Sequence, residues 1–303
     1  MSAWNRYIKD FVSYLKIERG LADNSILAYQ NDVQKLADYS LPRQKTVIDL
    51  TYNDLKDFVA VLYDLGLSAR SQARIISGLK QFFSFLLLEN EIKDDPSELL
   101  ELPKIGRKLP QFLSIEEIDL LIDSIDLSKN EGHRNRAIIE TLYSCGLRVS
   151  ELVNLRFSDL FFEEGFIRVI GKGNKERLVP VSPSVEKEIG IYNDFIRRHQ
   201  SIQPGNENVI FLNRRGAKLT RVMIFTIIKD LVGAAGISKN ISPHTFRHSF
   251  ATHMIEGGAN LRAVQEMLGH ESITTTEIYT HLDQRFLRDA IISYHPRNAR
   301  LIN

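Results

Sequence analysis

The sequence has one cysteine, no long apolar run and no marked excess of charge, and each of these absences excludes a class of protein. Because Cys145 has no second thiol to pair with, an internal disulfide is excluded, and we predict a reducing, cytoplasmic location. The first residues are polar and charged where a signal peptide requires an apolar core. No stretch approaches the roughly 20 apolar residues that span a bilayer, so no membrane contact is expected.

The composition is that of a globular protein with room for two domains. Of its 303 residues, 43% are hydrophobic and 25% charged, and the net charge is +1. This balance neither favours nor excludes nucleic acid as a partner. If the protein binds DNA, its fold must gather lysines and arginines on one face.

The spacing of apolar residues predicts an all-helical first part. Asp23 or Asn24 can cap its second helix, a capping box of Thr51 and Asp54 begins its third, and Ser68 can cap its fourth. The four helices are expected at about 4–19, 24–39, 51–65 and 68–90.

The fourth predicted helix carries Arg70, Arg74 and Lys80 on one side, and these are candidate DNA contacts. On spacing alone, an ordinary solvated helix face accounts for them as well. After this helix, residues 94–111 mix prolines and Gly106 with charges, which is typical of a linker between domains. We therefore expect one domain over residues 1–107 and a second over 108–303.

The second part combines helices with one small antiparallel sheet. Ser114 and Glu117 form a second capping box, and a Gly- and Asn-rich turn joins two β-strands of a hairpin. The hairpin strands are expected at 165–170 and 177–181, with a shorter strand at 209–212. Helices are expected at about 114–125, 134–146, 220–234, 244–256, 260–268, 272–280 and 284–293. The predicted fold class is therefore mainly α.

Several side chains of this second part are candidates for catalysis, although each alone has an ordinary explanation. Arg148 precedes an expected helix start, where it could bind phosphate together with backbone amides, or could simply pair with Glu151 at the surface. Lys172 lies in the turn of the hairpin, which suits a side chain that enters a groove or reaches a leaving group. Lys175 and Arg177 are rivals for that role and two further candidate DNA contacts.

Pro243 begins an expected helix on which His244 and Arg247, three residues apart, share a face. His244 and His248 are four residues apart, a spacing that zinc sites use. However, no glutamate completes a His-Glu-x-x-His pattern and Cys145 is remote, so no metal is predicted.

Two further candidates follow, His270 at the end of one expected helix and Tyr279 within the next. Alone, Tyr279 would be a half-buried packing residue. Two arginines, a lysine, two histidines and a tyrosine together form a coherent set for cleaving a phosphodiester without a metal or another cofactor. A tyrosine oxygen attacks phosphorus, the arginines neutralise the growing charge, the lysine protonates the leaving 5′ oxygen and a histidine takes the tyrosine proton.

Four blocks occur in order along the second part: CGLRVSELVNL (145–155), GKGNKER (171–177), SPHTFRHSFATH (242–253) and LGHESITTTEIYTHL (268–282). They resemble the motifs of the tyrosine recombinases, the phage integrase family, and in particular of its Xer type. The chain length, the helical first domain, the linker position and His295-Pro296-Arg297 fit the same family. Four ordered motifs are far more specific than any one of them.

The resemblance implies a role for each member of the set. Arg148 and Arg247 clamp the phosphate, Lys172 is the general acid, His244 and His270 bond the phosphate and help to move the proton, Tyr279 becomes a 3′-phosphotyrosine, and Glu151 orients the site from behind.

The resemblance also implies an architecture and partners. A helical SAM-like core-binding domain and the catalytic domain would close around double-stranded DNA at a specific site, in a tetramer with a related Xer recombinase. Strands would be exchanged through a Holliday junction, to resolve chromosome dimers before cell division with a DNA translocase of the FtsK type. A helix near 285–293 would dock into a neighbouring protomer through Phe286, Leu287, Ile291 and Ile292, unless it packs on its own domain.

Three alternatives remain from the sequence. The first is the integrase of a mobile element, which the lack of an added N-terminal arm-binding domain disfavours. A type IB topoisomerase would share the tyrosine chemistry but need no partner site. The third is a DNA-binding module without catalysis, which the intact catalytic set disfavours.

Overall fold

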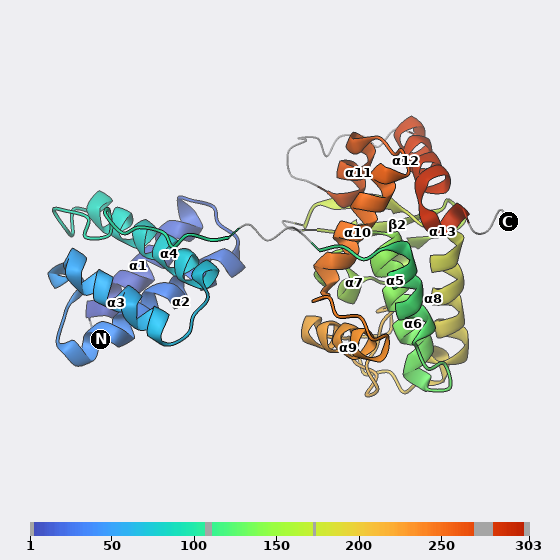
Figure 1. The fold of residues 1–303 in the computed structure, drawn as a ribbon, viewed down its shortest axis with the longest axis horizontal. Helices are drawn as coiled ribbons and strands as arrows, with labels where there is room; N and C mark the ends of the chain where they lie inside the picture. Colours follow the sequence, from blue (N-terminus) through green and yellow to red (C-terminus); the bar gives the residue numbers. More distant parts are fainter. Residues whose placement is uncertain (1–2, 107–110, 172–173, 270–280, 300–303) are drawn as a thin grey trace. The chain divides into compact units, whose positions relative to one another are not determined.

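A computed structural model describes residues 3–106, 111–171, 174–269 and 281–299. The chain divides into two compact units, Met1–Lys108 and Leu109–Asn303 (Figure 1). Each unit has its own hydrophobic core. Both are mostly helical, and one small antiparallel sheet lies in the second, so the predicted fold class is confirmed. None of the helices described is long and apolar enough to cross a membrane.

The described part of the N-terminal unit holds four α-helices and two short 3-10 turns. They are α1 (Ala3–Ile17), α2 (Asp23–Ser40), η1 (Leu41–Arg43), η2 (Val47–Asp49), α3 (Tyr52–Asp64) and α4 (Ala69–Leu88). The capping box of Thr51 and Asp54 and the Ser68 cap are confirmed. The cap expected for the second helix is wrong: α2 begins at Asp23 itself, after Ala22, and no side chain caps it.

Helix α4 supplies much of the core of this unit. Its apolar residues repeat at helical spacing, so that Ile75, Leu79 and Phe82 all face inward and are fully buried. Phe82 meets Phe11 of α1 edge to face, with 5.2 Å between the ring centroids. The exposed side of α4 carries mostly polar and charged side chains, with Leu87 and Leu88 exposed at its end.

The described part of the second unit holds nine α-helices, two 3-10 turns and three strands. They are α5 (Ile115–Asp123), α6 (Asn130–Ser144), α7 (Val149–Asn154), η3 (Phe157–Asp159), β1 (Leu160–Phe161), β2 (Phe166–Ile170), β3 (Glu176–Pro180), α8 (Pro183–Phe195), η5 (Arg197–His199), α9 (Arg221–Ala234), α10 (Pro243–Glu256), α11 (Leu261–Leu268), α12 (His281–Tyr294) and α13 (Pro296–Ala299). The capping box of Ser114 and Glu117 that begins α5 is confirmed.

The predicted hairpin is present as β2 and β3, which pair antiparallel, and β1 pairs with the outer edge of β2. The strand expected at 209–212 is wrong, because Val209 and Leu212 form only isolated bridges, with Arg156 and Lys218. A short apolar run is buried in either conformation, so its burial alone does not make it a strand.

Helix α10 runs through the core of the second unit beside α6, which also packs along α8 (Figure 1). Phe246, Phe250 and Met254 of α10 are fully buried. A buried hydrogen bond joins α6 and α10, with 2.8 Å between the Tyr143 hydroxyl and His253 Nδ1.

The last long helix, α12, packs on its own unit. Leu287 and Ile291 are 1% and 0% exposed and belong to the core of this unit. The expectation that these two side chains dock into a neighbouring protomer is therefore not what the structure shows. The driving force is the burial of apolar surface that the unit itself offers. Phe286 and Ile292 remain 49% and 44% exposed.

Candidate active site

The turn between α6 and α7 places the first arginine of the predicted set. Gly146 adopts φ +56° after α6, a conformation that side chains other than glycine rarely take. Two residues later, Arg148 lies at the start of α7, and its backbone amide donates to Glu151 Oε2 at 2.8 Å. The Arg148 guanidinium also donates from Nη1 to Glu151 Oε1 at 2.9 Å. Local helix geometry thus holds this pair together.

Glu151 receives a second arginine from the hairpin. Arg177 of β3 donates from Nη1 to Glu151 Oε1 at 2.8 Å and from Nη2 to Oε2 at 2.9 Å. Burial alone would raise the pKa of Glu151, but the hydrogen bonds and charges of Arg177 and Arg148 together lower it below its ordinary value. The carboxylate is therefore ionised at neutral pH.

The second predicted arginine, Arg247, lies in the first half of α10 and is 9% exposed. Its Nη1 donates to the Gly146 carbonyl at 2.7 Å, and its Nη2 donates to the Leu268 carbonyl. Burial, followed by the nearby charge of Arg148, lowers the pKa of Arg247 to about 10. It therefore keeps its charge at neutral pH.

The C-terminal end of α11 connects these groups. Arg177 Nε donates to the Met267 carbonyl at 2.8 Å, and Arg148 Nη2 donates to the Gly269 carbonyl at 3.2 Å. Together with the bond from Arg247 to Leu268, three arginines from three elements hold three successive carbonyls. The end of a helix carries partial negative charge, so cations there are favoured. We call Arg148, Glu151, Arg177 and Arg247 the arginine cluster.

His244 lies in the first turn of α10, three residues before Arg247, and is exposed. His248, one turn further on, is also exposed and meets the ring of Phe112 edge to face. Over the described ranges, no three histidine, cysteine or acidic side chains come close enough to hold a metal ion. Lys172, His270 and Tyr279 lie outside the described residues.

The five candidate DNA contacts have different surroundings. Arg70 and Lys175 are exposed, and Lys80 donates to the Glu98 carbonyl at 3.0 Å. Arg74 pairs with Asp32 but keeps half of its side chain exposed. Arg177 departs from the prediction, because its side chain is 7% exposed and its guanidinium is bound to Glu151 and Met267, so it is not free to enter a DNA groove.

Sequence reasoning missed two groups. Asp32 of α2 is 1% exposed and pairs with both Arg74 and Lys35, at 3.4 Å in the second case. The place of Arg177 in the arginine cluster was also missed. A buried acid among apolar residues was a signal for the first. For the second there was no local signal, because Glu151 lies 26 residues earlier in the chain.

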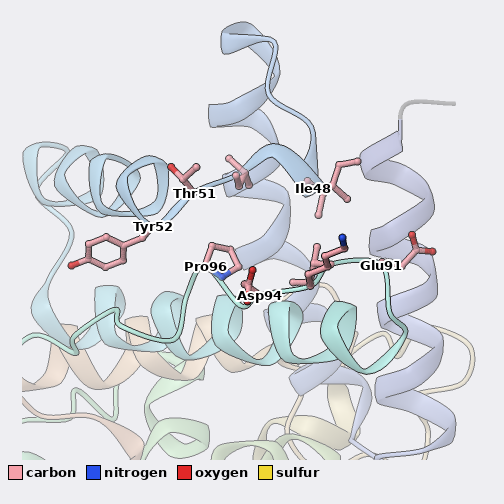
Figure 2. A pocket seen from close by; sticks show the side chains of 10 residues that line it. Ile48, Thr51, Tyr52, Glu91, Asp94 and Pro96 are labelled. Atoms are coloured by element: carbon pink, nitrogen blue, oxygen red, sulfur yellow. The ribbon is translucent and has the colours of Figure 1, made fainter.

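Two recesses lie elsewhere. Figure 2 shows the one in the N-terminal unit, with Tyr52 and Thr51 on one side and Asp94 and Pro96 on the other. The other lies between α6 and α8 and includes Arg134. Neither is lined by a member of the predicted catalytic set.

Comparisons with known proteins fit both units. The model of the phage integrase family matches residues 111–285, and that of the phage integrase N-terminal SAM-like domain matches residues 8–90. The tyrosine recombinase XerD of Staphylococcus epidermidis is 41% identical over 294 residues, 97% of this chain and 99% of the relative. That of Oceanobacillus iheyensis is 42% identical over 292 residues, 96% and 98% of the two chains.

Among solved structures, XerH bound to a palindromic difH substrate in a post-cleavage complex has a TM-score of 0.66 and 26% identity. The match covers 94% of this chain and 84% of XerH. A lambda integrase dimer bound to a core site has a TM-score of 0.68 over 90% of this chain and 98% of that one, and at 18% identity it supports the fold alone.

Fold and relatives together define a class, the tyrosine recombinases of the Xer type, which are enzymes that cut and rejoin DNA. The chain belongs to the phage integrase family, as the four motif blocks predicted.

Proposed function

We propose that this protein is a site-specific recombinase that resolves chromosome dimers by exchanging DNA strands through a Holliday junction. The observation that carries the proposal is the identity of 41% to a XerD recombinase over almost the whole of both chains. The catalytic set occurs within this match, and its two arginines, Arg148 and Arg247, both donate to carbonyls at the end of α11.

The chemistry is a transesterification at phosphorus. The hydroxyl of Tyr279 attacks, a bond forms from its oxygen to the phosphorus, and the bond to the 5′ oxygen breaks. Lys172 protonates the leaving 5′ oxygen, while His244 and His270 bond the phosphate and help to move the tyrosine proton. The reverse reaction with a new 5′ hydroxyl rejoins the strand. The phosphotyrosyl bond conserves the energy of the phosphodiester bond that is broken, so the proposed reaction requires neither ATP nor a metal.

Arg148 and Arg247 neutralise the non-bridging oxygens. Their guanidinium groups are fixed to the neighbouring carbonyls of Gly269 and Leu268, so both cations are oriented before a phosphate arrives. Donors that are oriented in advance toward developing charge stabilise the transition state without reorganisation. Removal of one such donor typically lowers a rate by about 10²–10³-fold.

The substrate of this reaction would be a duplex with a Xer-type core site. XerH, a related recombinase, is seen on difH DNA both before and after cleavage. We infer a tetramer on two such sites, with a second related Xer recombinase as partner. A DNA translocase of the FtsK type would bring the sites together at cell division.

The experiment is a search for the covalent intermediate. The protein is mixed with a nicked duplex that carries a Xer-type core site, in the presence of a chelator, and denatured. We expect a protein–DNA adduct in the wild type and none in Tyr279→Phe, whose DNA binding should be nearly unchanged. An adduct that persists in Tyr279→Phe would refute the assigned nucleophile. Lack of an adduct even with the partner recombinase would point to a protein that only binds DNA.

A further inference from the structure

Arg177 uses every nitrogen of its guanidinium within the protein. Nη1 and Nη2 donate to the two oxygens of Glu151 at 2.8 and 2.9 Å, and Nε donates to the Met267 carbonyl at 2.8 Å. Such a two-point pairing of arginine with carboxylate fixes both position and orientation. With 7% of its side chain exposed, Arg177 has little surface with which to contact DNA.

The effect of Arg177 reaches Arg148 through the shared carboxylate. Glu151 Oε1 accepts from both guanidinium groups, and Oε2 accepts from the Arg148 amide and from Arg177 Nη2. Without Arg177, the carboxylate would lose two donors and its charge would fall mainly on Arg148. A guanidinium neutralised in this way attracts a phosphate less strongly. Arg177 thus keeps an excess of positive charge in the cluster.

Arg177 also fixes the end of α11. Its side chain packs so tightly on Gly269 that a Cβ added there would lie 3.0 Å from Arg177 Cδ. Gly269 has φ +65°, which independently favours glycine. The Gly269 carbonyl is in turn the acceptor for Arg148 Nη2. Two separate paths, through Glu151 and through Gly269, therefore lead from Arg177 to the same guanidinium.

We propose that Arg177 is a positioning residue for DNA cleavage, which orients Glu151 and the end of α11 so that Arg148 presents its charge to the scissile phosphate. The inference rests on the proposed function, because it takes Arg148 to be a phosphate ligand. Arg177 itself touches neither DNA nor the reacting atoms.

The first test separates cleavage from binding. In Arg177→Gln, the single-turnover rate of adduct formation at saturating DNA should fall about 10–100-fold, the range seen when a residue behind an active-site group is removed. DNA affinity should fall much less than the cleavage rate and its salt dependence should stay unchanged, because Arg148 keeps its phosphate contact and no contact is lost. Arg168→Gln is the matched control. It removes an arginine of the adjacent strand β2 that pairs with Asp159 at 2.8 Å, and it should leave both quantities unchanged.

The second test asks whether the loss acts on the phosphate charge. A methylphosphonate at the scissile position lacks the negative oxygen that Arg148 would neutralise. The defect of Arg177→Gln relative to wild type should therefore shrink on this substrate, as should that of Arg148→Ala. A merely structural defect would be equally large on both substrates, and that result would overturn the proposal. If Arg177→Gln does not fold, Arg177→Lys is carried through the same two substrates.

The remaining outcomes distinguish this inference from the proposed function. If the wild type forms no Tyr279-dependent adduct, the proposed function fails first. If the wild type cleaves, Arg148→Ala is slow and Arg177→Gln is as fast as wild type, only the role of Arg177 is refuted. Weaker DNA binding of Arg177→Gln with a smaller salt dependence would instead make it a direct DNA contact.

Discussion

Asp32 in the N-terminal unit and Glu151 in the second unit are both buried carboxylates paired with arginine, but the two are used differently. In the N-terminal unit, Asp32 is 1% exposed while its partners Arg74 and Lys35 remain 50% and 44% exposed. In the second unit, Glu151 is 2% exposed and its partners Arg148 and Arg177 are 36% and 7% exposed. Asp32 thus holds two half-exposed cations, whereas Glu151 holds one cation that is about a third exposed and one that is buried.

The difference in exposure indicates which kind of effect the cations around Asp32 and those of the arginine cluster can have. Surface cations are screened by water and salt, so they suit a contact that adds affinity without fixing geometry. Arginines in a water-poor cluster, each bound to a backbone carbonyl, have little freedom and a stronger field. This is the environment in which a charge that develops during a reaction can be stabilised. We therefore expect chemical effects from the arginine cluster and binding effects from Arg74.

The largest effect should come from Arg247→Ala. It removes a buried cation and leaves the carbonyls of Gly146 and Leu268 without their donor. We expect adduct formation to fall by at least about 10³-fold at saturating DNA, since phosphate charge and positioning are both lost. Quench-flow measurement on a nicked site gives the rate. Arg214→Ala, which removes an exposed arginine of the same unit, is the control. Normal turnover of Arg247→Ala would contradict the chemical role expected for the arginine cluster.

The next effect concerns stability and uses two adjacent residues of α12. Ile291→Ala should destabilise the second unit by about 2–5 kcal/mol, because it empties a fully buried site. Ile292→Ala, at 44% exposure, should change stability by about 0.5 kcal/mol or less. Calorimetry measures both. Trp4 is the single tryptophan and is buried in the N-terminal unit, so its fluorescence reports the unfolding of that unit. The unfolding temperature that it reports should be unchanged in both variants. Equal losses in the two variants would contradict the packing of α12 on its own unit.

The helix caps at Thr51, Ser68 and Ser114 were predictable because each depends on residues three positions apart. The pairing of Arg148 with Glu151 could be proposed for the same reason. Helix α8 was missed although Val185, Ile189 and Tyr192 have helical spacing and are buried. Local rules thus predicted these three caps, although they failed for α2, which begins at Asp23 without a side-chain cap.

Contacts between distant segments were beyond such rules. The bond from Arg247 to Gly146 spans 101 residues, and that from Arg177 to Met267 spans 90. Nothing in the spacing of these residues indicates that they meet, since the core of the second unit brings them together. The family resemblance supplied the members of the predicted catalytic set, but not the acceptor that each arginine uses. It also gave no indication that Arg177 is buried.

A third effect is the pH dependence of stability, which should differ between the units because their histidine content differs. The N-terminal unit has no histidine, whereas the second buries His295 and His253. Burial, then the charge of Arg297, lowers the pKa of His295 to about 3, and burial also lowers that of His253. Between pH 3 and about 6.5 the unfolded chain therefore binds protons that the folded unit does not. Stability is present above this window and is lost as the pH falls through it.

We expect the shift of His295 to lower the free energy of unfolding of the second unit by about 1.4 kcal/mol on going from pH 6 to pH 5, and His253 to change it in the same direction. His295→Gln should remove one histidine's share of this slope. The Trp4 fluorescence transition should show no histidine-linked slope between pH 5 and 7, because the N-terminal unit has no histidine. The pKa of its Asp54 carboxylate is lowered by the bonds to Thr51, so that group titrates in stronger acid. Calorimetric scans in steps of pH test both statements, and equal slopes for the two units would contradict them.

The smallest effect should come from the N-terminal unit. Arg74→Gln removes one half-exposed cation, so the slope of log affinity against log salt should fall by about one, with cleavage at saturating DNA unchanged. Arg6→Gln makes the same charge change on α1, where the arginine pairs with Glu91, and should leave the slope unchanged if position rather than net charge matters. Titrations between 50 and 200 mM salt decide this, in the range where phosphate contacts are most visible. If Arg74→Gln slowed cleavage as much as a change in the arginine cluster, Asp32 would hold a catalytic group and the contrast between the two buried carboxylates would disappear.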